Sequence, residues 1–197
     1  MRKTRPRSIS TPRAKPLKLG FAALALIAVA CDQGGAAPPT VEFGQAPKLQ
    51  LTGRVVDSAN LLDEATERSL TERLTKLETE TTDQMIVVTV PSLEGQLIDK
   101  YSLDLANRWK IGRADVDNGV MLLVAPNEKK VQLEVGLGLG GLLTDERAAT
   151  IVWSMLPHFK SGEYDAGIVE GVIEVDQILS SDRRRPLPKP IEMKKAA

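Results

Sequence analysis

The chain has almost none of the side chains on which redox and zinc chemistry depend. Its 197 residues include one cysteine, Cys31, and one histidine, His158. An intramolecular disulfide needs two cysteines, and a zinc site needs several cysteine or histidine ligands, so the sequence excludes both. It also has no G-x-S-x-G elbow and no cysteine–arginine phosphatase loop. We interpret His158 as structural, and any hydrolysis would need a metal-activated water held by carboxylates.

Acidic residues are absent from the first 30 positions, which hold seven Lys and Arg residues. The last segment, 182–197, holds six basic residues against two acids. The part between them, 31–181, therefore has 13 basic and 24 acidic residues, a net charge of −11. An acidic domain repels nucleic acid and attracts cations, so we predict that this domain binds no nucleic acid.

The first 31 residues have the order of a signal peptide. Residues 2–18 are basic, and Leu19–Ala30 is a run of 12 apolar and small residues, too short to span a bilayer comfortably. Cys31 follows directly, in a sequence that resembles a bacterial lipobox except that Ala28 stands where leucine is preferred. We predict that 1–31 is a signal peptide with a lipobox-like end, and that lipidated Cys31 anchors the protein to the cell-envelope membrane on its periplasmic side. An organelle transit peptide is the alternative.

Three segments follow. Residues 32–50 contain GGAAPPT and few large apolar side chains, which predicts a flexible linker. Residues 51–181 carry the apolar patterns of one folded domain. Residues 182–197 are basic and Pro-rich, which predicts a disordered tail, and contact between its arginines and anionic lipid headgroups is the alternative.

The pattern of the domain predicts an α/β fold. Apolar residues recur at helical spacing in four segments, at 64–80, 98–110, 145–155 and 164–179. Asp63 and Thr144 are the expected N-caps of the first and third helices. Apolar and β-branched runs predict three strands, at 85–90, 120–125 and 130–135. One parallel crossover and one hairpin then make a small mixed sheet.

The stretch ADVDNG, residues 114–119, looks like the start of a calcium loop but fails as an EF-hand. Counted from Asp115, glycine arrives one position early, and Pro126 stands where the loop needs its glutamate. One interpretation is therefore a polar turn that leads into a strand.

The hairpin nevertheless brings oxygen-bearing side chains together. The start of its first strand lies beside the end of its second, so Asp117 and Asn118 should lie near Glu134. The parallel crossover should bring Asp83 to the same side, and Asp145 follows soon after, at a helix start. Oxygen ligands of this kind suit Ca²⁺ or Mg²⁺. Two alternatives stay open, because Asp145 could only cap a helix and Glu134 could only face solvent.

The run GLGLGG, residues 136–141, contains a G-x-G-x-x-G pattern after a strand and before a helix. It does not predict a dinucleotide site, because the strand is the second arm of a hairpin and no returning strand follows. We expect a close-packed turn whose backbone lies near the edge just described.

Five stretches, in order, resemble the TPM domain family, also called the TPM phosphatase or YgcG-like family. They are GRVVDSANLL, QMIVVTVPSLEG, NRWKIGRADVDNGVMLLVA, VQLEVGLGLGGLLTDERAATI and LPHFKSGEYDAGIVEGV. The resemblance implies a three-layer α/β/α sandwich on the outer side of a membrane. It also implies a cation site for Ca²⁺, with Mg²⁺ as the alternative, drawn from Asp117, Asn118, Glu134 and Asp145, with Asp57 nearby. Many bacterial members carry a C-terminal transmembrane helix, and here we expect Cys31 to provide the anchor instead.

These features together predict a membrane-anchored, Ca²⁺-binding accessory or maintenance factor for an envelope membrane protein. Two alternatives stay open. One is a weak metal-dependent acid phosphatase, an activity that the resemblance implies, with Arg113 and Arg147 as the nearest candidates for binding phosphate. The other is a protein-interaction module without a metal.

Overall fold

The computed structural model describes residues 49–181. The predicted signal peptide with Cys31, nearly all of the predicted 32–50 linker and the predicted 182–197 tail lie outside the described residues. Within the described residues, no helix is both long and apolar enough to cross a membrane.

Between residues 49 and 181, four strands form one mixed sheet in the order β1-β2-β3-β4. Their bounds are Val55–Asp57, Gln84–Thr89, Gly119–Ala125 and Lys130–Val135. The first three strands are parallel, and β4 runs antiparallel to β3. The three strands and the hairpin predicted from the sequence are present. Strand β1 was not predicted, because three residues are too few to display a period of two.

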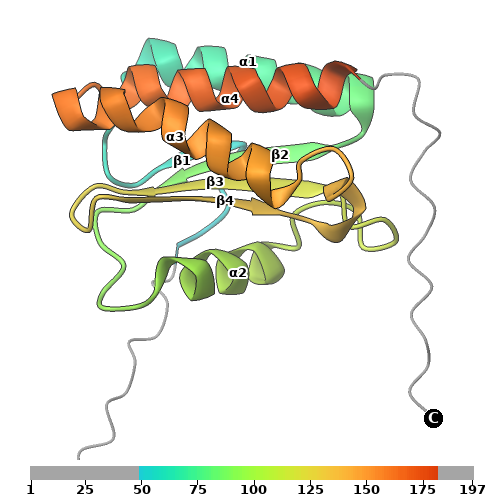
Figure 1. Ribbon diagram of the computed structural model, residues 1–197, viewed down its shortest axis with the longest axis horizontal. Helices are drawn as coiled ribbons and strands as arrows, with labels where there is room; N and C mark the ends of the chain where they lie inside the picture. Colours follow the sequence, from blue (N-terminus) through green and yellow to red (C-terminus); the bar gives the residue numbers. More distant parts are fainter. Residues whose placement is uncertain (1–48, 182–197) are drawn as a thin grey trace, which may run out of the picture. The chain divides into compact units, whose positions relative to one another are not determined.

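In the described part of the chain, four α-helices and one short 3₁₀ helix surround the sheet. Their bounds are α1 Glu64–Thr81, α2 Ile98–Trp109, η1 Leu137–Leu139, α3 Asp145–Ser161 and α4 Tyr164–Ser181. Helices α1, α3 and α4 cover one face of the sheet, and α2 covers the other (Figure 1). This confirms the three-layer α/β/α sandwich with a small mixed sheet.

The predicted caps begin their helices. An oxygen of Asp63 accepts a hydrogen bond from the Thr66 backbone N–H at 2.6 Å, and Thr144 accepts one from Arg147 N–H at 3.4 Å. Helix α3, however, continues six residues beyond the expected end at 155, to Ser161. Its last turns pack closely against α4, because Gly167 and Gly171 leave room there for side chains of α3. This contact between α3 and α4 extends the helix past the point where its helical spacing of apolar residues ends.

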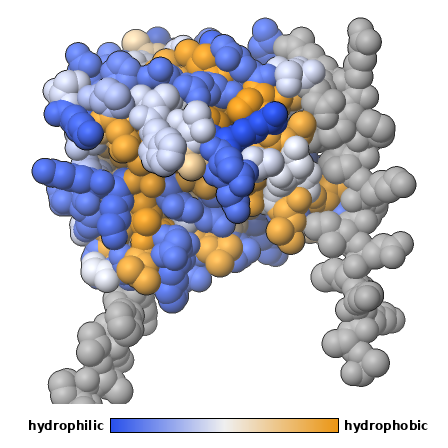
Figure 2. All heavy atoms as spheres, viewed as in Figure 1, coloured by the Kyte–Doolittle hydropathy of each residue, from blue (hydrophilic) through white to orange (hydrophobic). Residues whose placement is uncertain are grey.

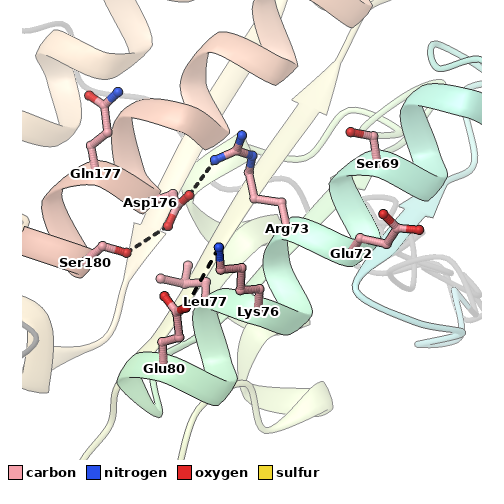
Figure 3. Close-up of a pocket in the computed structure, with 9 residues that line it drawn as sticks. All are labelled: Ser69, Glu72, Arg73, Lys76, Leu77, Glu80, Asp176, Gln177 and Ser180. Carbon is pink, nitrogen blue, oxygen red and sulfur yellow. Dashed lines mark hydrogen bonds and ion pairs between the residues drawn. The ribbon is translucent and has the colours of Figure 1, made fainter.

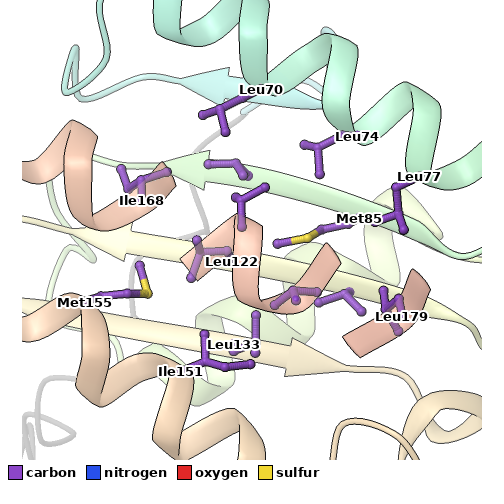
Figure 4. Close-up of a cluster of buried hydrophobic side chains, with 14 of the residues drawn as sticks. Leu70, Leu74, Leu77, Met85, Leu122, Leu133, Ile151, Met155, Ile168 and Leu179 are labelled. Carbon is purple, nitrogen blue, oxygen red and sulfur yellow. The ribbon is translucent and has the colours of Figure 1, made fainter. Parts of the chain in front are cut away.

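Two apolar cores separate the layers. Strands β2 and β3 are buried on both faces, so alternate residues enter different cores: Val87 points to the α1, α3 and α4 layer, and Val88 points to α2. Figure 4 shows leucines of α1 directed at the strands in the larger core. In the smaller core, Tyr101 of α2 is buried, and burial raises the pKa of its hydroxyl to about 12.

The two strand-to-strand crossovers have opposite hands. Strands β1, β2 and β3 are parallel and lie in sequence order, whereas their connecting helices, α1 and α2, lie on opposite faces of the sheet. Two right-handed crossovers in that strand order would place both helices on the same face. One crossover of this fold therefore departs from the right-handed rule.

Candidate functional site

The predicted convergence occurs where β3 begins and β4 ends. Val120 pairs with Val135, and Met121 pairs with Glu134. The backbone N–H of Gly136 donates to the Gly119 carbonyl at 2.8 Å. This register brings the Asp117–Asn118 pair, which precedes β3, beside the end of β4.

A groove of about 370 Å³ lies at this place, between α2 and the two strands. The Asp117 and Glu134 side chains both belong to its lining, which includes no lysine or arginine. Leu103 and Leu137 also line it, and they are 49% and 81% exposed. The groove therefore combines two carboxylates with exposed apolar side chains, a combination that favours a positively charged ligand.

Asp117 holds the turn after β4. Its backbone has a φ of +48°, its Oδ2 accepts from Leu137 N–H at 2.9 Å, and its carbonyl accepts from Gly138 N–H at 2.9 Å. A Cβ on Gly136 would clash with the backbone carbonyl of Asp117, so only glycine fits there without a shift. This confirms the close-packed turn expected from the glycine run.

Glu134 points toward α2, as its place in the β4 alternation requires. Its Oε2 accepts a hydrogen bond from the Ser102 hydroxyl at 2.8 Å, and Ser102 is buried in α2. The side chain is therefore half-buried and oriented by a partner, and the alternative that it only faces solvent is wrong. No sequence pattern marks Ser102 beyond its place next to Tyr101 on the apolar face of the helix.

Asn118 is fully buried and turned away from the groove. Its Nδ2 donates to the Thr82 carbonyl at 2.7 Å and to Asp83 Oδ1 at 3.1 Å, and its Oδ1 accepts from Arg113 N–H at 2.9 Å. These bonds use both ends of the amide. Asn118 therefore ties the loops before β2 and β3 together.

Asp145 and Asp57 are not brought to the groove. Asp145 is the first residue of α3, is exposed and does not line the groove. This agrees with the alternative that it is only an acid at the start of a helix. Asp57 lies at the other end of the sheet, which corrects the expectation that it is nearby. It is the last residue of β1, which runs parallel to β3, whereas Asp117 precedes the first residue of β3, so the two lie at opposite ends of the sheet.

Asp57 instead holds the segment that joins β1 to α1. Its carboxylate accepts from the Thr89 hydroxyl and from the backbone N–H groups of Leu61 and Leu62, at 3.1 and 2.9 Å. We expect Asp57→Ala to lower the free energy of unfolding by about 2–4 kcal/mol, because three donors lose a charged acceptor. Urea unfolding measures this, with exposed Asp115→Ala as the control. A loss no larger than that of the control would contradict the role.

The groove offers two carboxylates and not a closed cage of metal ligands. Ca²⁺ takes about six to eight oxygen ligands. Among residues 49–181, no group of three or more His, Cys, Asp or Glu side chains is placed to hold a metal ion. A cation at Asp117 and Glu134 would therefore keep several ligands from outside these two carboxylates.

Another hollow, of about 490 Å³, lies between α1 and α4 (Figure 3). Its lining has three acidic residues and two basic ones, a net charge of −1, and both basic residues lie close to an acid. Arg73 pairs with Asp176 at 2.6 Å, Ser180 donates to the same carboxylate at 3.0 Å, and Lys76 lies 3.9 Å from Glu80. This surface therefore has less to offer a charged ligand than the groove.

The chain is similar to a known domain and to several solved structures. A family model described as the TPM domain (TPM_phosphatase) matches residues 55–178, more than half of the chain. The N-terminal domain of a protein from P. gingivalis is 33% identical, with a TM-score of 0.63, over 68% of this chain and 86% of that one. A comparison with curated proteins finds no match.

Two further solved structures share the fold. The BA42 protein from the psychrophilic bacterium Bizionia argentinensis is 18% identical, with a TM-score of 0.54, over 68% of this chain and 88% of that one. The N-terminal domain of the cg2496 protein from Corynebacterium glutamicum is 11% identical, with a TM-score of 0.52, over 78% and 95%. The family match and the similarity to the P. gingivalis domain agree with the fold and with the five stretches of sequence. The chain therefore belongs to the TPM domain family.

Proposed function

We propose that this chain is a membrane-anchored accessory domain of the bacterial cell envelope that binds a divalent cation, Ca²⁺, in the groove between α2 and the β3–β4 hairpin. The observation that carries the proposal is that Asp117 and Glu134 line the same groove. No lysine or arginine lines it. Two carboxylates in a groove that no lysine or arginine lines favour a bound cation. The net charge of −11 over residues 31–181 favours the same ligand.

The incomplete cation shell supports an accessory role. Two carboxylates would fill only some of the coordination positions of a Ca²⁺ ion. The other positions would be open to water or to oxygen atoms of another protein. The exposed Leu103 and Leu137 offer that protein an apolar contact beside the ion. Residues 1–31, with their basic segment, apolar run and Cys31, support attachment to the membrane where such a partner would lie.

Calorimetric titration of the full chain with Ca²⁺ tests the proposal. We expect Asp117→Asn and Glu134→Gln each to weaken binding about tenfold or more, since each removes one of two charged ligands. Asp145→Asn, which lies outside the groove, serves as the matched control and should leave the affinity unchanged. Binding that survives both groove variants would place the cation elsewhere, and no heat with Ca²⁺ or Mg²⁺ would overturn the cation site.

Two other outcomes would replace the proposal. The arginines named for a phosphatase lie outside the groove lining: Arg113 pairs with Asp115 at 2.7 Å, and Arg147 donates to the Leu142 carbonyl at 2.6 Å. Metal-dependent turnover of a generic phosphate ester, lost in Asp117→Asn, would nevertheless establish the enzyme. Capture of an envelope protein without any cation would establish the metal-free interaction module.

A further inference from the structure

Strand β4 is an edge strand with open backbone groups. Because Gly136 N–H donates to the Gly119 carbonyl, every second residue from Gly136 back to Lys130 directs its backbone groups at β3. Val131, Leu133 and Val135 therefore direct their N–H and C=O groups away from the sheet. Within residues 49–181, these groups have no hydrogen-bond partner. Buried backbone groups are almost always paired, so this edge is open to water or to another strand.

The edge carries two charged side chains, Lys130 and Glu134, but lacks three other features that usually prevent strand pairing. Natural edge strands are commonly very short or interrupted by proline or a bulge. Strand β4 has six residues, KVQLEV, and pairs with β3 without interruption. In Figure 1 this strand lies on the near side of the sheet, and Figure 2 shows exposed apolar residues among polar ones on the same face.

The sequence of β4 is complementary to itself. In an antiparallel pair centred on Gln132, Lys130 of one copy lies opposite Glu134 of the other, and Val131 lies opposite Leu133. The valine and leucine are the residues with outward backbone groups, so this register makes them hydrogen-bonded pairs. Lys130 and Glu134 then face each other as opposite charges in the alternate, non-hydrogen-bonded pairs, which stabilises the pairing, and each pair of strands has two such contacts.

We propose that β4 pairs with β4 of a second copy of this chain, which joins the two sheets into one. The pairing places the second copy's lysine at position 130 beside Glu134, at the mouth of the groove. One consequence rests on the proposed function: this amine competes with Ca²⁺ for the Glu134 carboxylate. Strand pairing and cation binding therefore weaken each other. The pairing itself does not depend on a cation.

A disulfide at the centre of the pair tests the register. In the full chain with Cys31→Ser, Gln132→Cys would place two thiols directly opposite each other in a non-hydrogen-bonded pair, within disulfide distance. With EDTA present, we expect Gln132→Cys to form a covalent dimer on mild oxidation. Asn127→Cys, in the exposed hairpin turn, is the matched control and should stay largely monomeric. Equal dimer yields from the two variants would overturn the proposal.

Charge reversal tests the pairing without a cysteine. Sedimentation of the full chain should show association about tenfold weaker or more for Lys130→Glu and for Glu134→Lys, because each change sets like charges opposite each other twice. The double variant restores both attractions and should recover the dimer. A chain that is monomeric in every form, or a double variant weaker than both single ones, would overturn the proposal. Sedimentation, like the disulfide test, is carried out with EDTA, so a failed Ca²⁺ titration would not change the result of either experiment.

Discussion

Gly112→Ala is expected to lower the free energy of unfolding by about 2–5 kcal/mol. Two costs combine at this position. Gly112 has a φ of +85°, a conformation that costs an alanine about 1–2 kcal/mol. Its added Cβ would also lie 2.8 Å from the Gly119 Cα, and that atom belongs to the first residue of β3 and cannot move aside as a flexible side chain would. Urea unfolding of the full chain measures the loss.

Two other glycines separate these costs. Gly162 has a φ of +86° but open space around its Cβ position, so Gly162→Ala should show only the conformational cost. Gly141 has neither a positive φ nor a close neighbour, so Gly141→Ala should change stability by less than about 0.5 kcal/mol. If Gly112→Ala lowers the free energy of unfolding no more than Gly162→Ala does, the backbone around β3 shifts to accommodate the new methyl group. The contact between Gly112 and Gly119 would then not be rigid.

Asn118→Ala is expected to lower the free energy of unfolding by about 3–5 kcal/mol, because it leaves several buried polar groups without their partner. Asn118 is 0% exposed and Asp83 is 1% exposed, so water has little access to the groups left behind. The Thr82 carbonyl and the Arg113 N–H lose their bonds in the same change. Asn107→Ala, at an exposed position on α2, is the control and should be close to neutral.

The same variant distinguishes a structural asparagine from a cation ligand. The measurement is made once with EDTA and once with Ca²⁺. A structural role predicts the same loss in both, whereas a ligand role predicts a loss that appears only with Ca²⁺. An Asn118→Ala chain as stable as the parent in EDTA would show that its three hydrogen bonds contribute little.

The elements that the sequence predicted well are those with a strong local signal. The apolar runs of β2 and β3 and the caps at Asp63 and Thr144 are readable without the rest of the molecule. The three residues of β1 are not, because their pairing with Val87–Thr89 comes from a strand about 30 positions away. The true end of α3 is likewise decided by its packing against Gly167 and Gly171.

The site divides in the same way. The proximity of Asp117 and Glu134 follows from the hairpin register, which residue spacing determines. The direction of Asn118 does not, because it depends on where the loop at Thr82 and Asp83 packs. Asp57 entered the predicted set through family resemblance alone, and its unpredicted strand is what places it at the opposite end of the sheet.

The position of β1 also determines how the domain would respond to a pulling force. The chain enters the described domain through this outermost strand, whose three residue pairs join it only to β2. A load applied before Leu49 therefore reaches β1 before any other strand. The bonds of Asp57 to Leu61, Leu62 and Thr89 lie directly behind β1 and would carry the load next. Under tension the domain would release β1 first, which takes Val56 out of the smaller core while the groove at the far end of β3 stays folded.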